Sequence, residues 1–270
     1  MPSPVDGSGV LEPETHQFYV RTMQLLNDAQ APYLVGGAYA LGRYTGIHRH
    51  TKDFDIFVRR EDYDRTMEVL GGDGCTTELT FPHWLGKAIC VHGFVDVIFS
   101  SGNGIASVDE EWFEHAVDGE VLGMPVKLCP AEEIIWSKSF IMERERFDGA
   151  DIQHLLLARG PQLDWKRLLR RFGAEHWRVL FSHLTMFGFV YPSRRERIPA
   201  WVMNELMDHM QREMREPPPE DQVCRGTILS REQYLIDVRQ WDYQDGRLAL
   251  PGTMTAEQIQ HWTAAIEAHK

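Results

Sequence analysis

Two aspartates, Asp53 and Asp55, alternate with large apolar residues in the run TKDFDIFV that spans residues 51–58. Because the side chains of a β-strand alternate between its two faces, both carboxylates would project from one face while Phe54 and Ile56 enter a core. Two neighbouring carboxylates repel each other unless a cation lies between them. Mg²⁺ prefers one or two carboxylates together with phosphate oxygens. The pair therefore predicts a metal site that acts on a phosphate-bearing substrate.

A third carboxylate, Asp96, interrupts the otherwise apolar run VDVIF at residues 95–99. A charge inside such a strand is costly unless it is paired, bound to a metal or directed into a cleft. The alternative is an edge strand on which Asp96 simply faces solvent. Taken with the Asp53/Asp55 pair, Asp96 is a candidate for the same site.

The pair Gly36-Gly37 follows the short apolar segment 33–35 and precedes a predicted helix. Glycine lets bare backbone approach an anion, and the N–H groups and dipole at a helix N-terminus favour phosphate. A plain turn would have the same residues. In this context Gly36, Gly37 and the following Ala38 are candidates for phosphate binding.

Positive charge gathers around the aspartate pair, although the whole chain has a net charge of −12. Residues 41–60 contain five Lys or Arg and two His against two Asp. The overall charge argues against general DNA binding, which needs a basic surface. The local excess is typical of a site for a small anionic substrate, the alternative being an ordinary solvated loop.

The elements predicted to position these residues form an α+β fold, in which a mixed-sheet domain is followed by a helical domain. Pro130 opens the change to almost continuous helix, and Pro217-Pro218-Pro219 ends it. We therefore expect a catalytic domain at 15–129, a helical domain at 130–216 and a tail at 217–270 that packs on the body. The predicted helices are 15–30, 38–44, 60–70, 131–146, 148–158, 164–172 with Asp164 as N-cap, 174–189, 199–215 and 255–268, and the predicted strands are 33–35, 53–58, 75–81, 84–90, 94–99 and a hairpin within 121–128.

The four cysteines are widely spaced and show neither a zinc-binding nor a redox-dithiol spacing. We expect them to be reduced thiols of a cytoplasmic protein. The first residues, 1–14, have neither a basic start nor an apolar segment, and no apolar stretch reaches the ~18 residues of a membrane helix. No membrane partner is expected.

These features together resemble the nucleotidyltransferase superfamily typified by DNA polymerase β. Its pattern is a hydrophobic strand, Gly-Gly or Gly-Ser, a short helix, Asp-hydrophobic-Asp on the next strand and a third Asp on a later one. Residues 46–55 and the helix 131–158 look like small bacterial nucleotidyltransferases of the abortive-infection toxin type. The resemblance covers residues 18–160. It departs from the pattern in the long interval from Gly37 to Asp53, and in Ala38, whose position is often Ser or Thr.

The resemblance implies Mg²⁺- or Mn²⁺-dependent transfer of a nucleoside monophosphate from a nucleoside triphosphate, expected to be ATP, with release of pyrophosphate. The acceptor would be a small molecule, a protein or RNA. The implied catalytic and metal-binding residues are Asp53, Asp55 and Asp96, and the implied nucleotide- and phosphate-binding residues are Gly36, Gly37, Ala38, Arg49, Thr51, Lys52 and Lys138.

Two other functions fit the same residues. A non-catalytic member could bind a nucleotide or act as a toxin–antitoxin interaction protein, although all three carboxylates are present. A divalent-metal phosphohydrolase could use the carboxylates to activate water instead of an acceptor alcohol.

Overall fold

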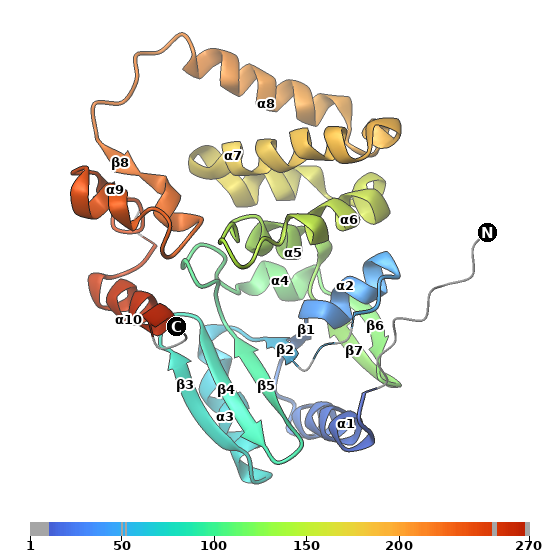
Figure 1. Cartoon of the computed structure of the whole chain (residues 1–270). Helices are drawn as coiled ribbons and strands as arrows, with labels where there is room; N and C mark the ends of the chain where they lie inside the picture. The colour runs from blue at the N-terminus through green and yellow to red at the C-terminus, as the bar shows by residue number, and fades with distance from the viewer. Residues whose placement is uncertain (1–10, 50, 52, 250–252, 268–270) are drawn as a thin grey trace. The chain divides into compact units, whose positions relative to one another are not determined.

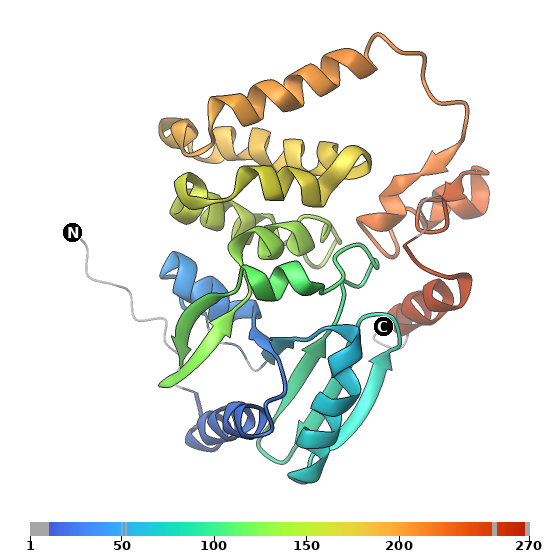
Figure 2. The same cartoon turned by 180° about the vertical axis from the view of Figure 1, so that it is seen from behind.

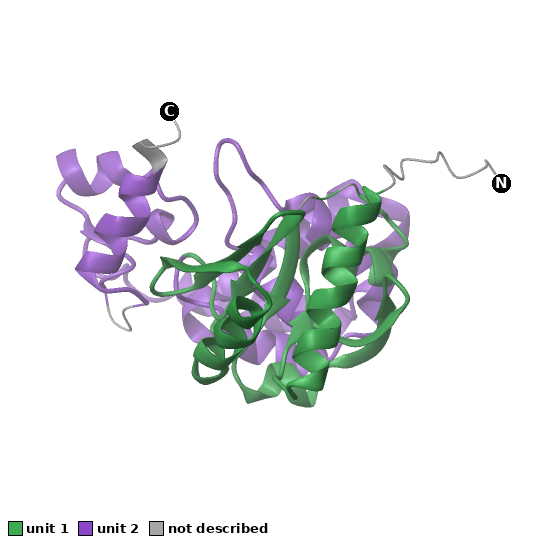
Figure 3. Ribbon diagram, turned by 90° about the horizontal axis from the view of Figure 1, so that it is seen from below, with its two compact units in different colours: residues 1–102, 107–130 green, residues 103–106, 131–270 purple. Residues whose placement is uncertain are grey.

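The computed structural model describes residues 11–49, 51, 53–249 and 253–267. The chain divides into two compact units, shown in Figure 3. Unit 1 comprises residues 1–102 and 107–130, and unit 2 comprises residues 103–106 and 131–270. The segment 217–270, predicted as a tail, thus belongs to the same unit as the helices between 131 and 216.

Unit 1 contains a mixed seven-stranded sheet with the strand order β3-β4-β5-β2-β1-β7-β6 (Figure 1). β2 runs parallel to β5 and β1 runs parallel to β7, whereas the other neighbouring pairs are antiparallel. This sheet has the mixed α/β character predicted from the sequence. The strands are β1 (Leu34–Val35), β2 (Asp53–Phe57), β3 (Thr76–Phe81), β4 (Leu85–Cys90), β5 (Gly93–Ile98), β6 (Val117–Val121) and β7 (Met124–Leu128).

Two helices of unit 1 cover the face of the sheet on which Phe54 lies. α1 (Pro13–Asp28) packs against α3 (Tyr63–Gly72), which lies over the strands in the view of Figure 2. The Tyr19 ring of α1 stacks on Phe54 with 4.8 Å between ring centroids. Tyr63 of α3 meets the Phe99 ring edge-on. The remaining helices of unit 1 are α2 (Gly37–Thr45), η1 (Arg60–Asp62) and α4 (Glu110–Glu114), and α4 was not predicted.

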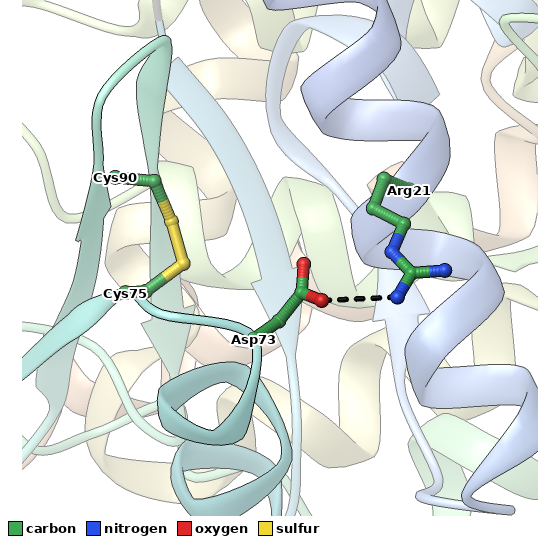
Figure 4. The surroundings of a disulfide bond; sticks show 4 residues. All are labelled: Arg21, Asp73, Cys75 and Cys90. Atoms are coloured by element: carbon green, nitrogen blue, oxygen red, sulfur yellow. Dashed lines mark hydrogen bonds and ion pairs between the residues drawn. A yellow bond between two sulfur atoms is a disulfide. The ribbon is translucent and has the colours of Figure 1, made fainter.

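Two of the cysteines form a disulfide, so the expectation of four reduced thiols was wrong. Cys75 precedes β3 and Cys90 ends β4, and the antiparallel pairing of Thr76 with Ile89 places the two cysteines opposite each other. Their Cα atoms are 4.5 Å apart (Figure 4). The sequence interval alone gave no sign of this, because the pairing depends on the strand register. Cys129 and Cys224 are free and buried.

We expect removal of the disulfide to lower the free energy of unfolding of unit 1. The bond closes a loop with a sequence separation of 15 residues, and loops of that length gain about 3 kcal/mol from cross-linking in the chain-entropy model. Urea unfolding of the Cys75→Ala/Cys90→Ala variant should therefore show a lower midpoint than that of the oxidised protein. Reductant should lower the midpoint of the wild type and leave that of the double variant unchanged. Equal midpoints without reductant would contradict the prediction.

Unit 2 is mainly helical. The predicted N-cap is confirmed, since the Asp164 carboxylate accepts a hydrogen bond of 3.0 Å from the Arg167 N–H. The predicted helix 131–146 ends at Lys138, where the chain turns back through a bridge between Met142 and Phe147. The two helices predicted at 164–172 and 174–189 are joined in one element that is kinked at Gly173.

None of the described helices in either unit is long and apolar enough to cross a membrane. The elements are α5 (Ala131–Lys138), α6 (Gly149–Arg159), η2 (Gly160–Gln162), α7 (Trp165–Val190), η3 (Pro192–Arg197), α8 (Ala200–Glu213), β8 (Val223–Cys224), η4 (Arg225–Ile228), α9 (Leu235–Gln240), β9 (Gln244–Asp245) and α10 (Ala256–Glu267).

Candidate active site

The three predicted carboxylates lie on one face of adjacent strands in unit 1. Asp53 and Asp55 are two positions apart on β2, so their side chains leave the same face. In the parallel pairing of β2 with β5, Asp55 lies directly opposite Asp96. The intervening Phe54 and Ile56 are fully buried on the other face, as the alternation predicted. Asp53 and Asp96, the first and last of the three in sequence, are more than 40 residues apart. The strand register brings all three carboxylates to one face of the sheet.

Asp55 also lies against the start of α2, which continues directly from β1. The Gly36 N–H donates a 3.0 Å hydrogen bond to the Asp55 carbonyl oxygen. Gly37 has a φ of +53°, and a Cβ built on it would lie 1.8 Å from the Asp55 Oδ2 atom. Any other residue would be strained at this position, because the backbone is left-handed and the Asp55 carboxylate occupies the space of a side chain. Ala38 follows in the first turn of the helix, whose N–H groups have no partners within the helix.

The three aspartates influence the pKa of one buried hydroxyl, that of Tyr19. Burial raises the pKa of the Tyr19 hydroxyl, and Tyr39, Asp53, Asp55 and Asp96 raise it further by electrostatic repulsion of the phenolate. Tyr19 is completely buried. This repulsion acts across the sheet, because the Tyr19 ring stacks on Phe54, whose side chain leaves the face of β2 opposite to that of Asp53 and Asp55.

The carboxylate of Asp96 is paired with Lys87 of β4, a residue that the sequence interpretation missed. The Lys87 Nζ atom is 2.5 Å from the Asp96 Oδ1 atom and 4.5 Å from the centroid of the Phe94 ring. Burial raises the pKa of Asp96, the hydrogen bond and charge of Lys87 oppose that shift, and Asp53 adds to it. The pattern of strand 84–90 placed Lys87 on a strand, but the cross-strand pairing that makes it a partner of Asp96 requires the register.

The basic segment before β2 is described in part. The Thr51 hydroxyl accepts a 3.0 Å hydrogen bond from the Asp53 N–H and donates one of 3.2 Å to the Asp53 carbonyl oxygen. It therefore fixes the backbone at the start of β2. Arg49 is exposed, and Lys52 lies outside the described residues.

Lys138, predicted as a phosphate ligand, lies at the end of α5 in unit 2. Its Nζ atom is 2.5 Å from Asp148 and 3.0 Å from Asp151, and only 15% of its side chain is exposed. The charge of Lys138 is therefore matched by two carboxylates within its own unit.

A divalent cation fits the donor set of Asp53 and Asp55. Two carboxylates with phosphate oxygens are what Mg²⁺ prefers, and Asp53 is exposed while Asp55 is half-buried. Across the described residues, no three His, Cys, Asp or Glu side chains are grouped closely enough to hold one ion. Within the described residues, the Asp96 carboxylate pairs with Lys87, whereas Asp53 and Asp55 lie two positions apart on β2.

No known family model and no curated protein matches this chain. Among solved structures, it is similar to the antibiotic-resistance factor ANT(2'')-Ia, with 14% identity, a TM-score of 0.42 and coverage of 73% of this chain and 97% of the other. The lincosamide antibiotic adenylyltransferase LnuA has 15% identity and a TM-score of 0.38, with coverage of 54% and 98%. An antigenic nucleotidyltransferase-like protein from Paracoccidioides brasiliensis has 16% identity and a TM-score of 0.43, with coverage of 70% and 93%.

Two of these solved structures are described as an adenylyltransferase and a nucleotidyltransferase-like protein. They are distant likenesses. The function of this chain is therefore inferred from its own residues.

Proposed function

We propose that this protein is a metal-dependent nucleotidyltransferase that transfers a nucleoside monophosphate from a nucleoside triphosphate to an acceptor. The observation that carries the proposal is the placement of three carboxylates on one face of adjacent strands, beside a glycine that starts a helix. This arrangement would join a cation site to a phosphate site within one unit.

In the proposed reaction, an acceptor oxygen attacks the α-phosphorus of the triphosphate. A new P–O bond forms, the bond from the α-phosphorus to the bridging oxygen of the β-phosphate breaks, and pyrophosphate leaves. The acceptor hydroxyl gives up its proton. Asp96 is suited to take that proton, because it is a half-buried carboxylate whose pKa is raised by burial.

The remaining residues bind and orient the triphosphate. Asp53 and Asp55 would hold a divalent cation, which when bound would polarise the phosphate and neutralise charge that develops on it. The first N–H groups of α2, at Gly37 and Ala38, would bind phosphate oxygens. Arg49 and Lys52 would neutralise the leaving pyrophosphate. Thr51 would keep the start of β2, and with it Asp53, in place.

The purified protein should be incubated with each α-³²P-labelled nucleoside triphosphate and Mg²⁺ or Mn²⁺, with a panel of small alcohols, total RNA and total protein as acceptors. Pyrophosphate together with a labelled acceptor would support transfer. Free nucleoside monophosphate in place of a labelled acceptor would instead identify a phosphohydrolase. Nucleotide binding without either product would identify a non-catalytic binding protein and overturn the proposal.

A further inference from the structure

The ion pair between Lys87 and Asp96 has a consequence for how many metal ions the site holds. We propose that Lys87 supplies the second positive charge of the site, so that one divalent cation binds at Asp53 and Asp55 while Asp96 pairs with Lys87 instead of ligating a second cation. This inference rests on the proposed function and specifies which positive groups neutralise the carboxylates of the same site.

The strand register places Lys87 in line with the carboxylates. β4, β5 and β2 are neighbours, and Lys87 lies opposite Asp96, which in turn lies opposite Asp55. Directly paired residues on adjacent strands project from the same face of the sheet. Lys87 therefore reaches the carboxylate face from the strand next to Asp96, on the side away from Asp55.

The ammonium group is held on two sides. Its Nζ atom lies 2.5 Å from the Asp96 Oδ1 atom and 4.5 Å from the Phe94 ring centroid. The two charged side chains are 26% and 16% exposed. At this degree of burial the pair is screened much less by salt than a surface ion pair, and loss of either partner leaves a poorly solvated charge. The contact with Phe94 adds a favourable cation–π interaction.

The pairing of Asp96 favours a single cation. Its carboxylate already has the Lys87 ammonium as a counter-charge, with 2.5 Å between the Lys87 Nζ and Asp96 Oδ1 atoms. A second divalent ion at Asp96 would either displace the ammonium or lie within a few ångströms of it, where like charges repel strongly. Lys87 can thus neutralise the Asp96 carboxylate in place of a second cation. Because Lys87 is part of the chain, its charge is present whether or not metal is bound.

Mn²⁺ binding to the whole protein tests this inference, with the free ion measured by electron paramagnetic resonance. We expect one Mn²⁺ per chain for the wild type, and loss of that ion in Asp53→Asn. Lys87→Met should remove the counter-charge of the Asp96 carboxylate and let the protein bind a second Mn²⁺, whereas Lys87→Arg should keep one. Lys127→Met is the matched control, because Lys127 is also a sheet lysine paired with an aspartate, Asp118, but lies on β7.

Transfer kinetics provide a second measurement. Lys87→Met should lower kcat at least about tenfold while the KM for the triphosphate changes little, since the cation at Asp53 and Asp55 is retained. Lys87→Arg should recover most of the loss. Circular dichroism and thermal unfolding would show that each variant is folded. If Lys87→Met does not fold, the number of Mn²⁺ ions bound by the wild type and the kinetics of Lys87→Arg test the inference.

Two kinds of failure can be told apart. Two equivalent Mn²⁺ ions on the wild type, or one ion on both the wild type and a folded Lys87→Met variant, would overturn the role of Lys87 and leave the proposed function standing. Absence of Mn²⁺ binding that depends on Asp53, together with absence of pyrophosphate release, would overturn both.

Discussion

Replacing Asp55 by Asn is expected to lower nucleoside monophosphate transfer by at least about a thousandfold, equivalent to about 4 kcal/mol of transition-state stabilisation. Asn has nearly the same shape as Asp but lacks the negative charge that a divalent cation requires. Asp55 is also the carboxylate that lies both opposite Asp96 and against Gly37. Its loss should therefore disturb the cation site and the phosphate site together. The rate of pyrophosphate release under saturating triphosphate measures the effect.

The matched control is Asp118→Asn. Asp118 is a strand aspartate of the same unit, but it is exposed on β6 and pairs only with Lys127, at 2.7 Å, among the contacts described for it. This variant should keep wild-type activity, and both variants should keep wild-type circular dichroism spectra. Asp53→Asn should show a loss of the same order as Asp55→Asn. Undiminished transfer by a folded Asp55→Asn protein would contradict the assignment of the site.

The local pattern around the aspartates was sufficient to predict how they are presented. The alternation of Asp53 and Asp55 with Phe54 and Ile56 indicated a strand with one buried face, and the structure has both apolar side chains fully buried. The pair Gly36-Gly37 indicated the turn from a strand into a helix, and α2 begins at Gly37. These predictions succeeded because each depends on residues that are neighbours in sequence.

The partners of these residues could not be predicted in the same way, because they depend on strand register. Lys87 pairs with Asp96 only because β4 and β5 align those two residues. Cys75 and Cys90 are bonded only because the hairpin of β3 and β4 places them opposite each other. Periodicity identifies the face on which a side chain lies, whereas one step in register changes every cross-strand neighbour.

Lys138 shows a related limit for helices. The resemblance implied a phosphate-binding role for Lys138, and that role stays a prediction, while the turn after α5 returns Asp148 and Asp151 to its ammonium group. Burial raises the pKa of Asp148, and the Arg146 hydrogen bond and the Lys138 charge outweigh that effect and lower it. A basic residue near a motif thus remains ambiguous until the acidic residues that fold back on it are known.

Replacing Gly37 by Ala is expected to reduce transfer by roughly a hundredfold, the loss that follows when a catalytic group is displaced by about 1 Å. The new Cβ would lie 1.8 Å from the Asp55 Oδ2 atom, so the carboxylate or the start of α2 must move. The left-handed backbone adds a cost of about 1 to 2 kcal/mol for any L-residue with a side chain. The variant should therefore lose both stability and activity.

Gly123→Ala separates these two effects. Gly123 also has a positive φ, of +80°, but a Cβ built there has nothing within 4 Å. It joins β6 to β7 in the same unit, so its replacement should cost a similar amount of stability and leave transfer unchanged. Urea unfolding and pyrophosphate release, measured on both variants, give the comparison. Equal activity of the two variants would mean that the contact between Gly37 and Asp55 does not position the carboxylate for catalysis, whereas a loss confined to Gly37→Ala would show that the bare backbone at the start of α2 is part of the site.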